Sequence, residues 1–222
     1  MSDLRVTVAI PVGPRPTDQQ WLEECLESVR QQTMPPDEIL LVDDMANLPP
    51  HDGCRIWRAP WRVGVACAFN FCVALAKNEL VFMLSDDDIL YPTCLERCLA
   101  TYERVGRIDG FYWAGVRYSD DREDQFFPFN GAMTTKGFWR MTGGFPPESG
   151  SGAPDAAFLS ILMVNGMFDR VQCIDTKEPQ YWYRVHENTD TGARGPWQGV
   201  ILETRHLLTH SWKPPEWGRY DT

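Results

Sequence analysis

Two groups of aspartate residues are the clearest candidates for chemistry in this sequence. The triplet Asp86, Asp87 and Asp88 directly follows a short apolar run, and the pair Asp43 and Asp44 follows another. Adjacent carboxylates repel one another, and no lysine or arginine stands beside the triplet in the sequence. A hard divalent cation would relieve this repulsion, and carboxylate oxygens select Mg²⁺ or Mn²⁺ over zinc. The pattern favours a metal site over the alternative, a solvated acidic turn that caps a following helix.

An alternating series of strands and helices must position these aspartates. Apolar runs bounded by turn residues indicate buried strands, and apolar residues at three- and four-residue spacing indicate amphipathic helices. We expect strands at 5–12, 38–42, 54–57 and 80–84, and helices at 17–29, 65–77 and from about 92. This alternation predicts an α/β fold with a mostly parallel sheet, which binds ligands beyond the carboxyl ends of its strands. Both aspartate groups lie at such strand ends.

The pattern changes at about residue 109, where aromatic, turn-punctuated segments begin. We expect antiparallel strands at 110–118 and 125–129, a Gly/Pro-rich loop at 143–154, a helix at 155–165, strands at 168–174 and 180–185, and a last helix at 199–208. Residues 211–222 show no periodicity and are expected to be extended or disordered. We therefore expect one domain over 1–210, with halves of about 1–108 and 109–210, followed by a tail at 211–222.

Composition and charge exclude several classes of protein. The chain has 222 residues, of which 43% are hydrophobic and 23% are charged, as in ordinary globular domains. Its charge is 21 − 31 = −10, which disfavours a protein that holds a polyanion over its whole surface. We see no membrane-spanning run and no export signal, so we expect a cytoplasmic protein. The seven cysteines form no CxxC pair, and we expect buried thiols.

Seven short motifs occur in order through most of the chain. They are the first strand 6–12, Glu27–Thr33 ("S(I/V)xxQT"), Val42–Asp44 ("VDD"), Gly64 with Asn70 and Ala76 ("G…N…A"), Ser85–Ile89 (DxD-type), Gly143–Phe145 with Pro154–Asp155 ("GGF…ED"), and Tyr183–His186 ("YRxH"). Together they resemble the family-2 glycosyltransferases of the GT-A fold. The resemblance implies a mostly parallel central sheet flanked by helices, with an antiparallel C-terminal extension on the acceptor side.

The resemblance also implies catalytic roles. Asp87 would be the main ligand of Mn²⁺ or Mg²⁺, with Asp88 and His186 as further metal residues. Asp155 would be the general base that takes the proton of the acceptor hydroxyl, which predicts inversion by a single displacement. The alternatives are a helix cap for Asp155 and an ordinary hydrogen-bonded histidine at position 186.

The donor implied by the resemblance is a nucleotide-diphospho-sugar, most simply a UDP-sugar. The residues expected to bind it are Pro11, Val12, Asp43, Asp44, Gly64, Asn70, Asp86 and Arg62.

The chain departs from the family pattern at the donor site. A Tyr-Asn type of pair is missing after the first strand, and Phe69 replaces an arginine that is common before the helix asparagine. Arg58, Arg62 or Arg194 would then meet the diphosphate, unless they are solvated surface residues. The "QxxRW" signature of processive synthases is absent, so we expect transfer of one sugar per encounter.

The acceptor is not specified by any motif. Trp139 and Trp182 are acceptor-side candidates because sugar rings stack on flat aromatic surfaces, while core packing is the alternative for most tryptophans. Glu148 is a further acceptor-side candidate and the rival to Asp155 as base. The acceptor would be a saccharide or another hydroxyl-bearing molecule. A hydroxylated base in DNA, met by Arg55, Arg58 and Arg62, is disfavoured by the net charge.

Two other functions remain open at this point. A nucleotidyltransferase shares the nucleotide-binding sheet but usually has a Gly-rich basic loop after strand one, where this chain has only Gly13 and Arg15. A nucleotide- or sugar-binding module without turnover would not need Asp155.

Overall fold

The fold is described from a computed structural model, in which residues 3–14, 19–121, 130–146, 154–174, 178–186 and 219–220 are placed. The strands of the larger sheet are β1 (Val6–Val12), β2 (Glu38–Asp43), β3 (Cys54–Arg58), β4 (Leu80–Met83), β6 (Phe111–Trp113), β8 (Ala132–Thr135), β9 (Val171–Cys173) and β11 (Arg219–Tyr220). A smaller sheet contains β5 (Ile89–Leu90), β7 (Val116–Tyr118) and β10 (Tyr181–Tyr183). The helices are α1 (Gln19–Arg30), α2 (Val65–Leu75), α3 (Cys94–Arg104), α4 (Lys136–Thr142) and α5 (Pro154–Val164), with a 3₁₀ turn, η2 (Phe168–Arg170).

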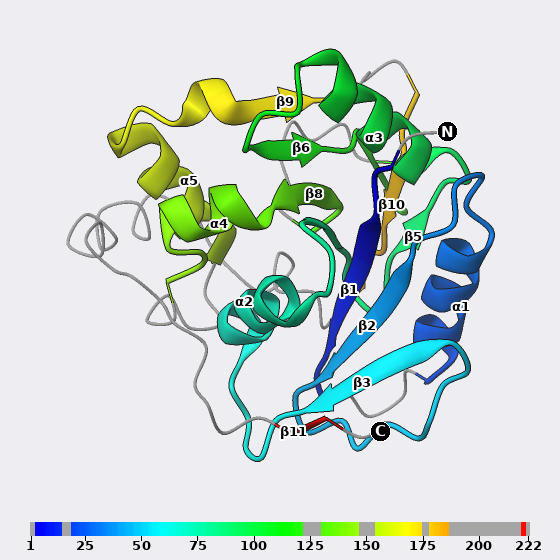
Figure 1. Ribbon diagram of the computed structural model, residues 1–222. Helices are drawn as coiled ribbons and strands as arrows, with labels where there is room; N and C mark the ends of the chain where they lie inside the picture. The colour runs from blue at the N-terminus through cyan, green and yellow to red at the C-terminus, as the bar shows by residue number, and fades with distance from the viewer. Residues whose placement is uncertain are drawn as a thin grey trace.

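The larger sheet has the strand order β11-β3-β2-β1-β4-β8-β6-β9. Strands β3, β2, β1 and β4 are parallel to one another, as the alternation of strands and helices predicts. Beyond β4 the sheet continues with β8, which is antiparallel to both β4 and β6. The mixed sheet with helices on both faces confirms the expected fold class (Figure 1).

The two faces of the larger sheet bury separate hydrophobic clusters. Alternate residues of β1 point to opposite faces, so Val8 and Ile10 pack in the cluster that contains α1 and α3, and Ala9 packs in the cluster of α2, α4 and α5. Figure 1 shows α1 and α2 on opposite sides of the strands. Because β1 is buried on both faces, its sequence is almost continuously apolar.

Two elements in the second half were not expected from the sequence. Strand β8 contains buried threonines and no apolar alternation, so its pattern is not that of an ordinary core strand. Helix α4 is short, and its start is fixed locally because Thr135 Oγ1 accepts a hydrogen bond from the Phe138 N–H. The helix ends at Gly143, which has a left-handed conformation with φ 78°.

Other expectations meet the structure in part. The expected strand 168–174 begins with η2 and is extended only over β9. The expected strand 125–129 and helix 199–208 lie outside the described residues. In the tail, Arg219 and Tyr220 pair antiparallel with β3. Within the described parts of the chain, every helix is too short or too polar to cross a membrane.

Candidate active site

The candidate site lies at the carboxyl edge of the parallel strands. Because β2, β1 and β4 are neighbours and run in the same direction, the residues after them come together at one edge. Asp44 follows β2, Gly13 follows β1, and the acidic loop Ser85–Asp88 follows β4. The strand order reverses on the two sides of β1, and open α/β sheets bind ligands at such a point.

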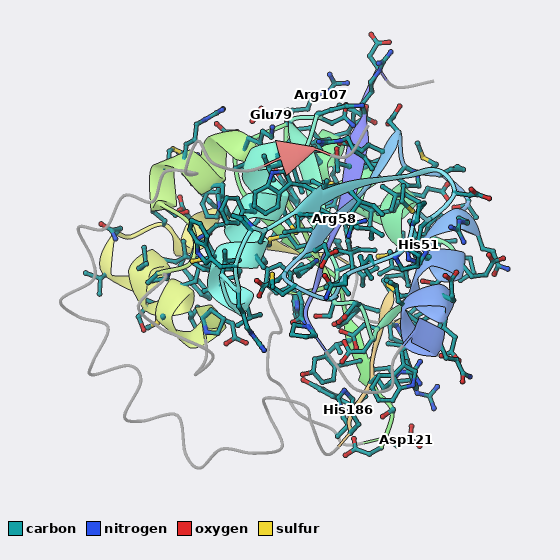
Figure 2. All side chains as sticks on the ribbon, turned by 90° about the horizontal axis from the view of Figure 1, so that it is seen from below. His51, Arg58, Glu79, Arg107, Asp121 and His186 are labelled. Carbon is teal, nitrogen blue, oxygen red and sulfur yellow. The ribbon has the colours of Figure 1, made fainter. Side chains whose placement is uncertain are left out.

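The three aspartates of the acidic loop are all buried, with relative exposures of 7%, 5% and 1% for Asp86, Asp87 and Asp88. Asp87 Oδ2 lies 2.9 Å from Nε2 of His186, which is contributed by the segment after β10. Figure 2 shows His186 at the same end of the molecule as Asp121, because β10 and β7 are parallel neighbours. The structure thus brings together two residues of the predicted metal site that are 99 positions apart.

Asp88 is bonded within the protein through both carboxylate oxygens. Its Oδ1 accepts from the main-chain N–H of Arg184 at 2.8 Å, and its Oδ2 accepts from the Tyr181 hydroxyl and from Asn130 Nδ2 at 3.4 Å. Burial, and then the nearby Asp87 carboxylate, raise the pKa of Asp88 well above its usual value. The role of Asp88 as a metal ligand remains a prediction. A bound cation would have to share a carboxylate oxygen of Asp88 with these donors.

Helix α1 supports the acidic loop along one face. Cys25 Sγ donates to the Ser85 carbonyl at 3.4 Å, and Ser28 Oγ accepts from the Leu90 N–H at 3.1 Å. Trp21 lies one turn earlier on the same face, and its ring centroid is 4.6 Å from that of His186. One face of α1 therefore contacts both Ser85, the first residue of the acidic loop, and Leu90 in β5, which follows the loop.

The "SxxxQT" end of this helix holds the chain after the loop. Gln32 Nε2 donates to the Tyr91 carbonyl at 2.9 Å, and Gln32 Oε1 accepts from the Leu95 N–H at 3.0 Å. The Thr33 N–H donates to the Pro92 carbonyl at 2.8 Å. The motif thus has a structural role that explains its spacing: it fixes the segment that leads from the acidic loop into α3.

The two aspartates after β2 anchor neighbouring loops. Asp43 is buried and accepts from the backbone N–H groups of residues 46, 47 and 48 and from Arg58. Asp44 accepts from the Val63 and Gly64 N–H groups at 2.6 and 3.0 Å. Asp44 therefore ties the end of β2 to the start of α2. Contact of these aspartates with a nucleotide remains a prediction.

The remaining predicted donor residues at this edge differ in exposure. The carbonyl of Val12 accepts from the Asp44 N–H at 2.8 Å, and Pro11 is half-buried in β1. Arg62 is exposed on the loop that Asp44 anchors.

Arg58 is paired with Asp43, and Arg55 is paired with Glu38 at 2.7 Å. Two of the three arginines suggested for DNA are thus bound to buried carboxylates of the protein.

Asn70 is fully buried in α2 and holds the "GGF" loop. Its Nδ2 donates to the Phe145 carbonyl at 2.8 Å, and its Oδ1 accepts from the Phe145 N–H at 2.9 Å and from Trp139 Nε1 at 3.2 Å. Gly144 has φ +74°, and a Cβ there would overlap Asn70 Oδ1. Only glycine fits this position.

Trp139 belongs to the core, which corrects its interpretation as an acceptor-side residue. Its ring packs against Phe145 and Phe158 at centroid distances of 5.0 and 5.2 Å, and it is 5% exposed. The sequence left core packing open as the alternative, because it shows the aromatic residue but not the face of the fold that the residue occupies. Trp182 is only half-buried and lies in β10, the central strand of the smaller sheet. Glu148 lies outside the described residues.

Asp155 is the second residue of α5 and is half-buried. A carboxylate in the first turn of a helix is stabilised by the helix dipole. Phe158, one turn later, packs against Phe145 and Trp139, so the start of α5 is attached to the same cluster as the "GGF" loop. Its role as general base remains a prediction.

Two side chains at this edge, Asp87 and His186, could contribute ligands to a divalent cation. Asp87 and His186 face each other, and in the described part of the chain no group of three or more His, Cys, Asp or Glu side chains is arranged to hold a metal. Mg²⁺ and Mn²⁺ commonly take one or two protein ligands, and complete their shell with water and substrate phosphate. Two protein donors fit a cation of that kind.

Sequence reasoning gave no role to several residues that organise the site. Arg184, Glu24, Tyr181 and Asn130 all hold the acidic loop or its neighbours. Arg184 stands inside the "YRxH" motif, so its position was visible although its partners were not. The others carry no signal in a single sequence, because their contacts are distant along the chain.

The sheet and the acidic loop at its carboxyl edge define a GT-A type of glycosyltransferase. The model of the family "Glycosyl transferase family 2" matches residues 7–147, more than half of the chain. The chain therefore belongs to glycosyl transferase family 2.

A curated relative is glycosyltransferase GlyG of Streptococcus pneumoniae serotype 4 (strain ATCC BAA-334 / TIGR4). It is 28% identical to this chain over 139 residues, which cover 58% of this chain and 44% of GlyG. The chain therefore matches less than half of the length of this relative.

The fold is similar to crystal structures of TarS from S. aureus. The complex of TarS 1-349 with UDP-GlcNAc has a TM-score of 0.70 and 14% identity, covering 92% of this chain and 65% of that one. The complex with UDP has a TM-score of 0.68 and 14% identity, covering 95% and 67%. At this identity the likeness concerns the fold.

Proposed function

We propose that this glycosyltransferase is a metal-dependent, inverting and non-processive enzyme that uses a nucleotide-diphospho-sugar. The observation that carries the proposal is the pairing of Asp87 with His186 at the switch point of the sheet, beside two further buried carboxylates. A site with this excess of negative charge is suited to a cation, and a cation is suited to a diphosphate. The complexes of TarS with UDP and UDP-GlcNAc support a uridine donor.

The roles of the chain's residues follow from their positions. Asp87 and His186 would hold Mn²⁺ or Mg²⁺, which neutralises the diphosphate when bound. Asp44 and the loop that it anchors would border the nucleoside, with Arg62 toward the phosphates. Asp86 lies in the same loop as Asp87 and would border the ribose.

The reaction that we propose is a single displacement. The acceptor oxygen forms a bond to the anomeric carbon while the bond from that carbon to the diphosphate oxygen breaks. Asp155 takes the proton of the acceptor hydroxyl, and the nucleoside diphosphate leaves with the bonding electrons. Attack from the face opposite the leaving group inverts the anomeric configuration.

The acceptor that we propose is a saccharide or another small hydroxyl-bearing molecule. Trp182, half-buried on the central strand of the smaller sheet, is the tryptophan nearest in sequence to His186 among the described residues. DNA is a poorer candidate, because Arg55 and Arg58 pair with buried carboxylates and the net charge is −10.

A thermal-shift experiment tests the coupling of metal and nucleotide. UDP should raise the melting temperature when Mn²⁺ is present and have little effect with a chelator, because the diphosphate completes the metal shell. Asp87→Ala should remove the effect of Mn²⁺ while the protein stays folded. Equal stabilisation by UDP in the presence of a chelator would contradict the metal-dependent donor site.

A further inference from the structure

Arg184 contacts the acidic loop and helix α1 at the same time. Its main-chain N–H donates to Asp88 Oδ1 at 2.8 Å, and its Nε donates to the Asp87 carbonyl at 2.8 Å. A terminal nitrogen of the same guanidinium donates to Glu24 Oε2 at 2.5 Å. One residue therefore joins the acidic loop to both β10 and α1.

Two tryptophan rings confine the guanidinium of Arg184. The Cζ atom lies 5.2 Å from the ring centroid of Trp21 and 4.8 Å from that of Trp182. Aromatic faces attract cations, and this attraction grows when the group is shielded from water, as it is here with 17% of the side chain exposed. Trp21 also touches His186, with centroids 4.6 Å apart.

The alternation of side chains along β10 and the residues after it explains why Trp182, Arg184 and His186 lie on the same side of this segment. Side chains alternate along an extended segment, so residues 182, 184 and 186 point away from residues 181 and 183. Tyr181 and Tyr183 are buried in the core cluster. Arg184 and His186 lie on the other side, where both contact Trp21 of α1, and Trp182 lies beside the Arg184 guanidinium.

We propose that Arg184 is the positioning residue of the active site. By fixing the backbone of the acidic loop against α1 and β10, it keeps the Asp87 carboxylate and the His186 imidazole facing each other. This inference concerns the arrangement of the site, and only its catalytic consequence rests on the proposed function. Arg184 acts through Asp87 and His186, because its Nε and a terminal nitrogen are already bonded to protein oxygens.

Lysine cannot replace arginine in this position. The Arg184 guanidinium donates in two directions while its Cζ lies close to two tryptophan rings, and an ammonium group is a compact point charge without this planar fork of donors. Arg184→Lys therefore keeps the charge near the aspartates but loses the fixed geometry. The matched control is Arg117→Lys on the neighbouring strand β7, where the arginine is exposed and pairs with Asp121, which is more exposed still.

The first readout is the NMR signal of the His186 ring in the protein without metal or nucleotide. In ¹⁵N-histidine-labelled protein, with His186 assigned through His186→Gln, Arg184→Lys should displace the ring signals of His186 and leave those of His51 in place. Arg117→Lys should displace neither. Unchanged His186 signals in a folded Arg184→Lys protein would overturn the inference, whether or not sugar transfer is detected.

The second readout is the division between kcat and KM for the UDP-sugar. Loss of an outer residue that orients metal ligands typically costs about 10- to 100-fold, and we expect that loss in kcat with the donor KM changed much less. Wild-type kcat in Arg184→Lys would also overturn the inference. If the wild-type protein itself binds no UDP, the proposed function fails, and the NMR result still decides the positioning role.

Glu24→Gln provides a second variant if Arg184→Lys does not fold. It leaves Arg184 in place and removes only its carboxylate partner on the surface of α1, where the Glu24 side chain is 37% exposed. We expect a smaller displacement of the same His186 signals. A folded Glu24→Gln protein without any displacement would show that the contact to α1 does not position the site.

Discussion

At the scale of single residues, the proposed chemistry depends most on Asp155. The side chain is half-buried in the first turn of α5, at the positive end of the helix dipole. Asp155→Asn keeps the size of the side chain and removes the base. General-base catalysis contributes about 100- to 10,000-fold, or roughly 3 to 5.5 kcal/mol, so kcat should fall by that factor. UDP affinity, measured by calorimetry, should stay close to the wild-type value.

The control for this variant is Glu148→Gln, which changes the rival carboxylate that precedes α5 in the sequence. It should leave kcat within a small factor of the wild-type rate. Undiminished transfer by Asp155→Asn, together with a large loss in Glu148→Gln, would show that the base is Glu148.

At the scale of elements, the "GGF" loop links the core to the start of α5. Gly144 has φ +74°, and an added Cβ would overlap Asn70 Oδ1 and lie 2.6 Å from Trp139 Nε1. Gly144→Ala should lower the free energy of unfolding by about 2 to 4 kcal/mol, because a left-handed alanine costs about 1 kcal/mol and the strained hydrogen bonds cost the rest. Urea denaturation monitors this loss.

Gly53→Ala is the matched control for the backbone effect. Gly53 has the same φ of +74°, but a Cβ added there would have nothing within 4 Å. Its substitution should cost only about 1 kcal/mol. Equal losses in the two variants would show that the contacts with Asn70 and Trp139 add nothing to the effect.

The elements of the first half could be predicted from the sequence, and some of those of the second half could not. Strands β1, β2 and β4 are buried on both faces, so their continuous apolar runs identify them directly. Strand β8 has buried threonines whose hydroxyls bond nearby groups, and only the tertiary structure shows that it is a core strand. Strand β5 has two residues, which is too short for any periodicity.

The same limit applies to the candidate site. Asp87 and Asp155 were identified from their order in motifs, and the motifs also included Arg184. The pairing of Asp87 with His186 and the burial of Trp139 depend on contacts across the fold, which no local spacing encodes. A motif therefore indicated which residues to consider, and the fold showed which of them contact one another.

At the scale of the whole molecule, the pKa of a buried carboxyl group is shifted in opposite directions at the two edges of the sheet. At the carboxyl edge three aspartates lie together, and burial raises the pKa of Asp88. At the amino edge Glu38 stands alone among donors: its oxygens accept from Thr7 Oγ1, the Lys77 N–H and Arg55 Nε, each at 2.7 Å. The hydrogen-bond donors around Glu38 favour its charged form, whereas burial and the nearby Asp87 carboxylate disfavour the charged form of Asp88.

This difference predicts how stability depends on pH. Burial alone would raise the pKa of Glu38, but the donors from Lys77, Thr7 and Arg55 outweigh it and the pKa lies below its usual value. A carboxylate with a lowered pKa in the folded state stabilises the protein fully above its unfolded pKa, and this stabilisation is lost as the pH falls through the folded pKa. The window for Glu38 therefore lies below the ordinary glutamate pKa of about 4.3.

Glu38→Gln tests this compensation. At pH 7 the substitution should lower the free energy of unfolding by about 2 to 3 kcal/mol, because charge-assisted bonds to a side chain that is only 5% exposed are lost. The difference between the variant and the wild type should shrink as the pH falls below about 4, where Glu38 becomes protonated in the wild type too. Urea denaturation at a series of pH values measures this difference.

The control is Glu103→Gln, which breaks an exposed pair with Arg107 and should change the free energy of unfolding by less than about 0.5 kcal/mol at every pH. A loss in Glu38→Gln that is the same at pH 3 and pH 7 would mean that the charge of Glu38 contributes nothing, and that its hydrogen-bonding shape alone holds the amino edge together.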